Sequence, residues 1–131
     1  RLASGVTVDR ARALVALKRQ DEAATALDEA CKADPDNGEA WLLSATLERR
    51  GGRLWAAQTA IEQAARVQPE DADVGLEAGV IAMLAGREDA ARKSWNSVLA
   101  TAPDSPAAKT ARGYLAQLGP APAATPVAKK D

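Results

Sequence analysis

The chain of 131 residues contains no histidine and no phenylalanine, and it has one cysteine, one methionine and one tyrosine. Without histidine, the side chain that most often serves as a general base or metal ligand near neutral pH is missing. The single Cys31 has no internal disulfide partner and no evident activating base, so we expect a buried, unreactive thiol. Gly51-Gly52 matches a helix stop rather than a phosphate-binding loop. The sequence therefore predicts no catalytic residue, no metal site and no cofactor.

The sequence also lacks a basic excess and a long apolar run, and these two absences argue against nucleic acid and membrane as partners. Lys and Arg number 17 against 18 Asp and Glu, so the net charge is −1 and the basic excess typical of nucleic-acid binding is missing. No apolar run is long enough for a signal or membrane segment, and we expect no direct membrane insertion. The chain begins with Arg1 rather than Met, so we expect it to be processed or cut from a longer protein. Its composition is compatible with a bacterial cytoplasm or periplasm.

What the sequence does contain is an internal repeat. Three prolines, Pro35, Pro69 and Pro103, are evenly spaced and define a period of about 34 residues. Two residues after each proline comes a side chain that accepts a hydrogen bond at a helix start, namely Asn37, Asp71 and Ser105. Gly52 and Gly86, separated by the same period, are placed to end helices in the left-handed conformation. The signals predict two helices per unit.

Between these signals the apolar residues recur with helical spacing, and Ala, Leu, Glu, Lys and Arg favour helix. The predicted helices cover residues 4–17, 20–33, 38–50, 54–67, 72–85, 88–101 and 106–118. With Phe absent, the core must be built mainly from Leu, Val, Ile and alanine. The segment 119–131 is rich in Pro and Ala with almost nothing large to bury, and we expect it to be a disordered tail.

The pattern of large and small residues resembles the tetratricopeptide repeat family. The second unit matches best, with Trp41, Ala45, Gly52, Ala57, Ile61, Ala64 and Pro69. The third offers Gly79, Gly86, Ala91, Trp95, Val98 and Pro103, but has Gly75 at the large-residue position. The first has Ala11, Ala23, Leu27, Ala30 and Pro35, with Thr7 at the large-residue position and Lys18 in place of the loop glycine.

The resemblance implies an all-α fold, a right-handed α-solenoid of three helical hairpins and a C-terminal capping helix. One hairpin cannot bury its own apolar face, whereas stacked hairpins build a continuous core. We expect a repeat domain over residues 1–118, with repeats at 4–37, 38–71 and 72–105 and the capping helix at 106–118.

The family also implies a function, since its concave groove, lined by the first helix of each repeat, binds other proteins. Carrying the groove positions onto this chain gives Val8, Arg12, Val15, Leu42, Thr46, Arg49, Arg50, Asp73, Leu76, Glu77, Val80, Met83 and Tyr114. We expect Leu42, Leu76, Val80 and Met83 to supply apolar contacts. Arg12 and Arg49 are expected to orient the partner or hold a carboxylate.

The expected occupant is an apolar or amphipathic segment of another protein, bound without catalysis. Some family members bind acidic chaperone tails through a clamp of Lys, Arg and Asn side chains. The matching positions here are Val8, Arg12, Leu43, Asp73 and Glu77, so this clamp is absent.

Three alternatives stay open at this point. The apolar groove positions are also explained by packing within the array. The chain could instead be a self-assembly unit that forms homo-oligomers through its repeat ends or through Trp55, which either folds back over Gly51-Gly52 or is exposed. A regulatory segment of a larger enzyme is the third alternative.

Overall fold

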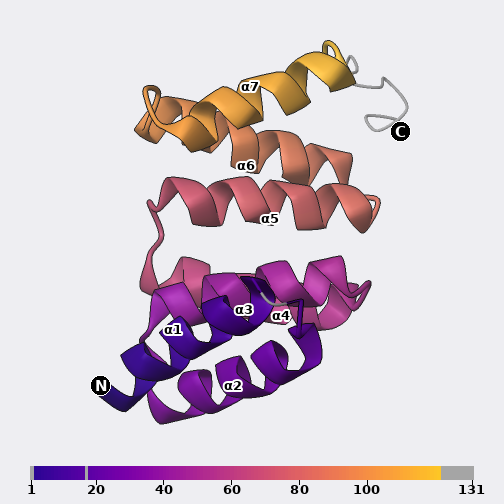
Figure 1. The fold of residues 1–131 in the computed structure, drawn as a ribbon. Coiled ribbons are helices and arrows are strands. Elements are labelled where there is room, and N and C mark those ends of the chain that lie inside the picture. The colour runs from indigo at the N-terminus through magenta and orange to yellow at the C-terminus, as the bar shows by residue number, and fades with distance from the viewer. Residues whose placement is uncertain (1, 17, 122–131) are drawn as a thin grey trace, which may run out of the picture.

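The computed structural model describes residues 2–16 and 18–121, and all regular secondary structure in these ranges is helical (Figure 1). The helices are α1 (Leu2–Ala16), α2 (Gln20–Ala33), α3 (Gly38–Arg50), α4 (Leu54–Val67), α5 (Ala72–Leu84), α6 (Glu88–Thr101) and α7 (Pro106–Leu118). The all-α prediction is confirmed, and the predicted helix bounds agree to within two residues. Residues 122–131 of the expected tail lie outside the described residues.

The starts of α3, α5 and α7 are fixed by the capping side chains that the sequence predicts. Asn37 Oδ1 accepts a backbone N–H of the first turn of α3 at 3.1 Å. Asp71 Oδ1 accepts two such N–H groups of α5 at 2.9 and 3.0 Å, and Ser105 Oγ accepts one of α7 at 3.0 Å. These bonds satisfy donors that have no partner inside the helix, so α3, α5 and α7 each begin at a defined residue.

The turn inside each hairpin uses one residue with a positive φ. Gly52 has φ of 80° and Gly86 has φ of 79°, as the sequence predicts for helix stops. In the first hairpin the same position is occupied by Lys18, whose φ is 63°. A residue with a Cβ atom is strained in this conformation, whereas glycine is not. The first turn therefore keeps the geometry of the other two at a conformational cost.

Replacing Lys18 with glycine is expected to stabilise the fold. Relief of the positive φ outweighs the extra backbone entropy of glycine, for a net gain of about 0.5–1 kcal/mol. In thermal unfolding, the midpoint should rise by about 2–6 °C. The reciprocal variant Gly52→Lys should lower the midpoint, and a Lys18→Gly variant that unfolds earlier than the parent chain would contradict the expectation.

The helices form a stack of antiparallel hairpins. The pairs α1 with α2, α3 with α4 and α5 with α6 make the most extensive contacts, and each hairpin then packs on the next, with α7 closing the last one (Figure 1). The first helices also contact each other in succession, α1 with α3, α3 with α5 and α5 with α7. The fold is thus a helical-repeat solenoid in which four helices share one face.

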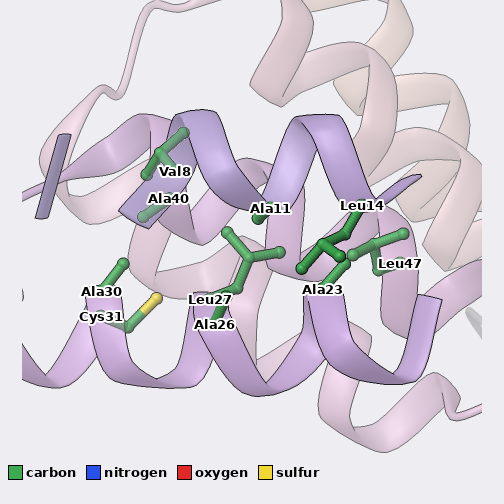
Figure 2. Packing of buried hydrophobic residues seen from close by; sticks show 10 residues of the cluster. All are labelled: Val8, Ala11, Leu14, Ala23, Ala26, Leu27, Ala30, Cys31, Ala40 and Leu47. Atoms are coloured by element: carbon green, nitrogen blue, oxygen red, sulfur yellow. The ribbon is translucent and has the colours of Figure 1, made fainter. Parts of the chain in front are cut away.

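The core is made largely of small residues. Figure 2 shows its N-terminal part, where side chains of α1, α2 and α3 meet. The buried cluster consists of Val8, Ala11, Leu14, Ala23, Ala26, Leu27, Ala30, Cys31, Ala40 and Leu47. Half of these residues are alanines, which lets the helices approach closely, and the packing of such a core is sensitive to each added or removed methyl group.

The third hairpin keeps the same design with a larger difference in size between two facing residues. Its Gly79 lies against Trp95, and a Cβ atom at Gly79 would come within 2.1 Å of the indole Nε1. The matching pair of the second hairpin, one repeat earlier, is Ala45 with Ile61. A smaller residue on α5 thus makes room for a larger one on α6.

An exchange of sizes between neighbouring helices explains the departure at Gly75. A Cβ atom there would come within 2.6 Å of a methyl group of Val98. The second hairpin has Trp41 and Ala64 at these positions, so large and small residues have traded places. The family pattern is broken at Gly75 because the neighbouring helix already fills that space.

Candidate functional site

A groove runs along the face shared by α1, α3, α5 and α7. It encloses a volume of about 460 Å³. Its lining residues are Arg12, Glu39, Leu42, Leu43, Thr46, Arg49, Gln68, Asp71, Asp73, Leu76, Glu77, Val80 and Tyr114. Because these side chains come from four helices and the α4–α5 turn, only the stacking of the hairpins brings them together.

A second, apolar cavity adjoins the groove. This end pocket has a volume of about 290 Å³ and lies where the C-terminal half of α5 meets α6 and α7. It is lined by Val80, Met83, Leu84, Trp95, Tyr114, Gln117 and Leu118. Val80 and Tyr114 line both cavities, so the groove and the end pocket are neighbours that share these two side chains. Tyr114 is held there by Trp95, since the centroids of the two rings are 5.1 Å apart.

Most positions that the repeat register assigns to the groove do lie on it, but four do not. Val8 is fully buried in the cluster of Figure 2 and is not available to a partner. The reason is its place between α1, α2 and the start of α3, where the small Ala40 belongs to the same cluster. Val15 is half-buried and packs against that cluster. Arg50 is exposed outside the groove lining, and Met83 lines the end pocket instead.

Arg49 forms the central ion pair of the groove with Glu77. Arg49 Nε donates to Glu77 Oε2, and Arg49 Nη2 donates to Oε1 at 3.2 Å. Thr46 Oγ1 also donates to Oε1 at 2.9 Å. Glu77 is only 8% exposed, so its charge is compensated by these neighbours rather than by bulk water. The hydrogen bond to Glu77 raises the pKa of the Arg49 guanidinium, which stays charged.

The second arginine of the groove is also paired. Arg12 Nη2 lies 2.7 Å from Glu39 Oε2, and Nη1 lies 3.5 Å from Asp9 Oδ1. Both groove arginines thus bridge successive first helices, from α1 to α3 and from α3 to α5. That Arg12 and Arg49 orient a partner or hold its carboxylate stays a prediction, and each of them already has a carboxylate partner within the chain.

The groove positions predicted from the sequence do not include four of the lining residues, Glu39, Leu43, Gln68 and Asp71. Glu39 had a usable signal, since it lies one repeat before Asp73 and the register places both at the same point of successive repeats. The sequence pattern places Leu43 only at a position of the missing clamp. For Asp71 the sequence predicts a capping role, and the structure shows that this residue also lines the groove.

Other candidate features lie away from the groove. Cys31 is buried, and burial raises the pKa of its thiol to about 12, which agrees with an unreactive cysteine. The residues that the structure describes contain no cluster of acidic, cysteine or histidine side chains suited to a metal ion. Within the same residues, no helix is both long and apolar enough to span a membrane.

Trp55, whose orientation the sequence left open, points into solvent. The side chain of Trp55 is 84% exposed. Among the described residues, Leu84 is the other large apolar residue that is exposed, at 56%. It does not fold back over the Gly51-Gly52 turn as a packing residue.

Comparison with known proteins agrees with this architecture. Two family models, both described as tetratricopeptide repeat, match residues 5–47 and 44–106. No curated protein sequence matches the chain.

Similar solved structures span nearly the whole chain. The first tetratricopeptide repeat domain of Spaghetti (RPAP3), bound to an HSP90 peptide, has a TM-score of 0.81 at 17% identity over 89% of this chain and 93% of that chain. The tetratricopeptide repeat domain of Arabidopsis OM64 has a TM-score of 0.79 at 20% identity, over 88% of this chain and 96% of that chain. YrrB, described as a tetratricopeptide repeat protein with an unusual peptide-binding site, has a TM-score of 0.75 at 20% identity. The match covers 84% of this chain and 57% of that chain. The family matches and the shared fold together show that the chain belongs to the tetratricopeptide repeat family.

Proposed function

We propose that the chain is a noncatalytic protein-interaction module whose groove binds a peptide or helical segment of another protein. The observation that carries this proposal is the groove itself, which side chains of four helices line and along which Leu42, Leu76 and Val80 lie. A concave surface that combines apolar side chains with charged and polar ones can bind a peptide segment through both kinds of contact.

The similar structures support this proposal through their own ligands. Both repeat domains of Spaghetti are bound to an HSP90 peptide, and YrrB has a peptide-binding site. A different neighbour, the O-GlcNAc transferase of Thermobaculum terrenum, is an enzyme, but the match covers only 20% of that chain. The fold is thus found both as a separate peptide-binding domain and as part of a larger enzyme.

Selection of peptides tests the proposal without knowledge of the natural partner. A phage-displayed library of random twelve-residue peptides would be selected on the chain, and the enriched peptides measured by fluorescence anisotropy. Leu42→Gln should weaken their binding about tenfold or more, because a leucine contact contributes about 1.5–3 kcal/mol when fully buried. Leu42 lies on the groove and is only partly buried, so circular dichroism should show unchanged helix content.

Trp55→Ala is the matched control, since it removes a larger apolar side chain outside the groove. Its affinity for the peptides should equal that of the parent chain. If no peptide is enriched, or if Leu42→Gln binds as well as the parent chain, the groove is not the binding site.

The exposure of Trp55 favours a second candidate function, self-association. An indole ring that is 84% exposed is a strong contact residue when a second copy covers it. Light scattering over a concentration series separates the two functions. A mass of 13.6 kDa throughout would exclude self-association, whereas a rise that Trp55→Ala abolishes would support it.

A further inference from the structure

The charges of the groove are unbalanced. Two arginines line it together with four carboxylates, so its net charge is −2. Arg12 and Arg49 are each paired with a carboxylate, as described above. The two remaining acids are Asp71 and Asp73, both at the N-terminal end of α5. One end of the groove is therefore anionic.

The two remaining acids differ in availability. Asp71 Oδ1 is engaged in capping α5. Asp73 is exposed, and within the described part of the chain its carboxylate makes no hydrogen bond and no ion pair. Asp73 is thus the groove carboxylate that is free to accept a hydrogen bond from a bound cation.

The opposite end of the same helix is apolar. Met83 and Leu84 line the end pocket with Trp95 and Leu118, and no charged residue is among its lining residues. Asp73 and Met83 are ten positions apart on α5, which corresponds to about 15 Å along the helix axis. An anionic end of the groove and an apolar end pocket therefore lie a defined length of α5 apart, in two neighbouring cavities that share Val80 and Tyr114.

We propose that the groove selects a segment with a basic side chain at one end and a large apolar side chain at the other, separated by this same length of α5. The Lys or Arg side chain pairs with Asp73, and the apolar side chain enters the end pocket. In an extended segment these two residues are about five positions apart, at about 3.3 Å per residue, and in a helical segment about ten. This proposal rests on the proposed function of the groove and specifies the chemistry of its partner.

The enriched twelve-residue peptides test the proposal through their sequences. We expect Lys or Arg to recur with a fixed spacing from Leu, Phe, Trp or Met. With such a peptide as the probe, Asp73→Lys should weaken binding about tenfold, because an attractive pair becomes a repulsive one. The same peptide with its basic residue changed to Glu should bind Asp73→Lys more tightly than the parent chain.

Glu62→Lys supplies the control for the change of net charge. Glu62 is exposed on α4 and is not part of the groove lining, so affinity should change less than twofold. Met83→Gln tests the apolar end and should weaken binding severalfold.

Failure of this inference and failure of the proposed function give different results. Peptides that lose affinity for Leu42→Gln but carry acidic residues, or that bind Asp73→Lys as well as the parent chain, would overturn this inference and leave the proposed function intact. Absence of any peptide sensitive to Leu42→Gln would overturn the proposed function and this inference together.

Discussion

Replacement of Arg49 with methionine is expected to destabilise the fold by about 3 kcal/mol, because it leaves a buried carboxylate without its cation. Glu77 is 8% exposed and receives hydrogen bonds from both Arg49 and Thr46. Methionine retains most of the apolar stem of arginine and none of its charge. The side chain of Arg49 is 22% exposed, so the expected loss lies at the lower end of that for a fully buried pair. Urea unfolding of parent and variant measures the difference.

The double variant Arg49→Met with Glu77→Leu distinguishes an unpaired charge from lost packing. When both charges are removed, no carboxylate stays unsatisfied, and most of the lost stability should return. Thr46 Oγ1 keeps a second acceptor, the carbonyl oxygen of Leu42 at 3.2 Å. A loss below about 1 kcal/mol in Arg49→Met would mean that water compensates Glu77 and that the pair contributes little.

Replacement of Gly79 with alanine is expected to destabilise the fold by about 2–3 kcal/mol. The new methyl group would lie 2.1 Å from Trp95 Nε1 and 2.5 Å from two ring carbons. Trp95 is 3% exposed, and its Nε1 donates to the carbonyl oxygen of Leu76 at 3.2 Å, so the ring has little freedom to move. Alanine has the higher helix propensity, which offsets only about 1 kcal/mol of this cost.

Gly113→Ala is the matched control for helix propensity. Gly113 occupies the same repeat position on α7, and a Cβ atom there meets nothing within 4 Å. This variant should gain about 0.5–1 kcal/mol in urea unfolding. The double variant Gly79→Ala with Trp95→Ile restores the Ala–Ile pair of the second hairpin and should lose less than the sum of the single changes. Equal effects of alanine at positions 79 and 113 would refute the role assigned to the indole ring.

The sequence was sufficient to predict the helices, their limits and the order of the repeats. Asn37, Asp71 and Ser105 act on the backbone within three residues, and Gly52 and Gly86 act through their own φ angles. Such signals are local, so they are readable before any tertiary contact is known. The repeat register also placed Leu42, Leu76 and Val80 on the groove, since a period fixes which face of the stack a position occupies.

Other properties were decided by the tertiary structure. Val8 lies one repeat before Leu42, yet it is buried while Leu42 lines the groove, because α2 and Ala40 enclose it. Arg49 and Glu77 lie on different helices, and which charge is paired depends on the distance between α3 and α5 rather than on either local sequence. The pairing of charges in the groove is therefore decided by how its helices pack side by side. The repeat register assigns positions to a face, but it does not determine which side chains meet across that face.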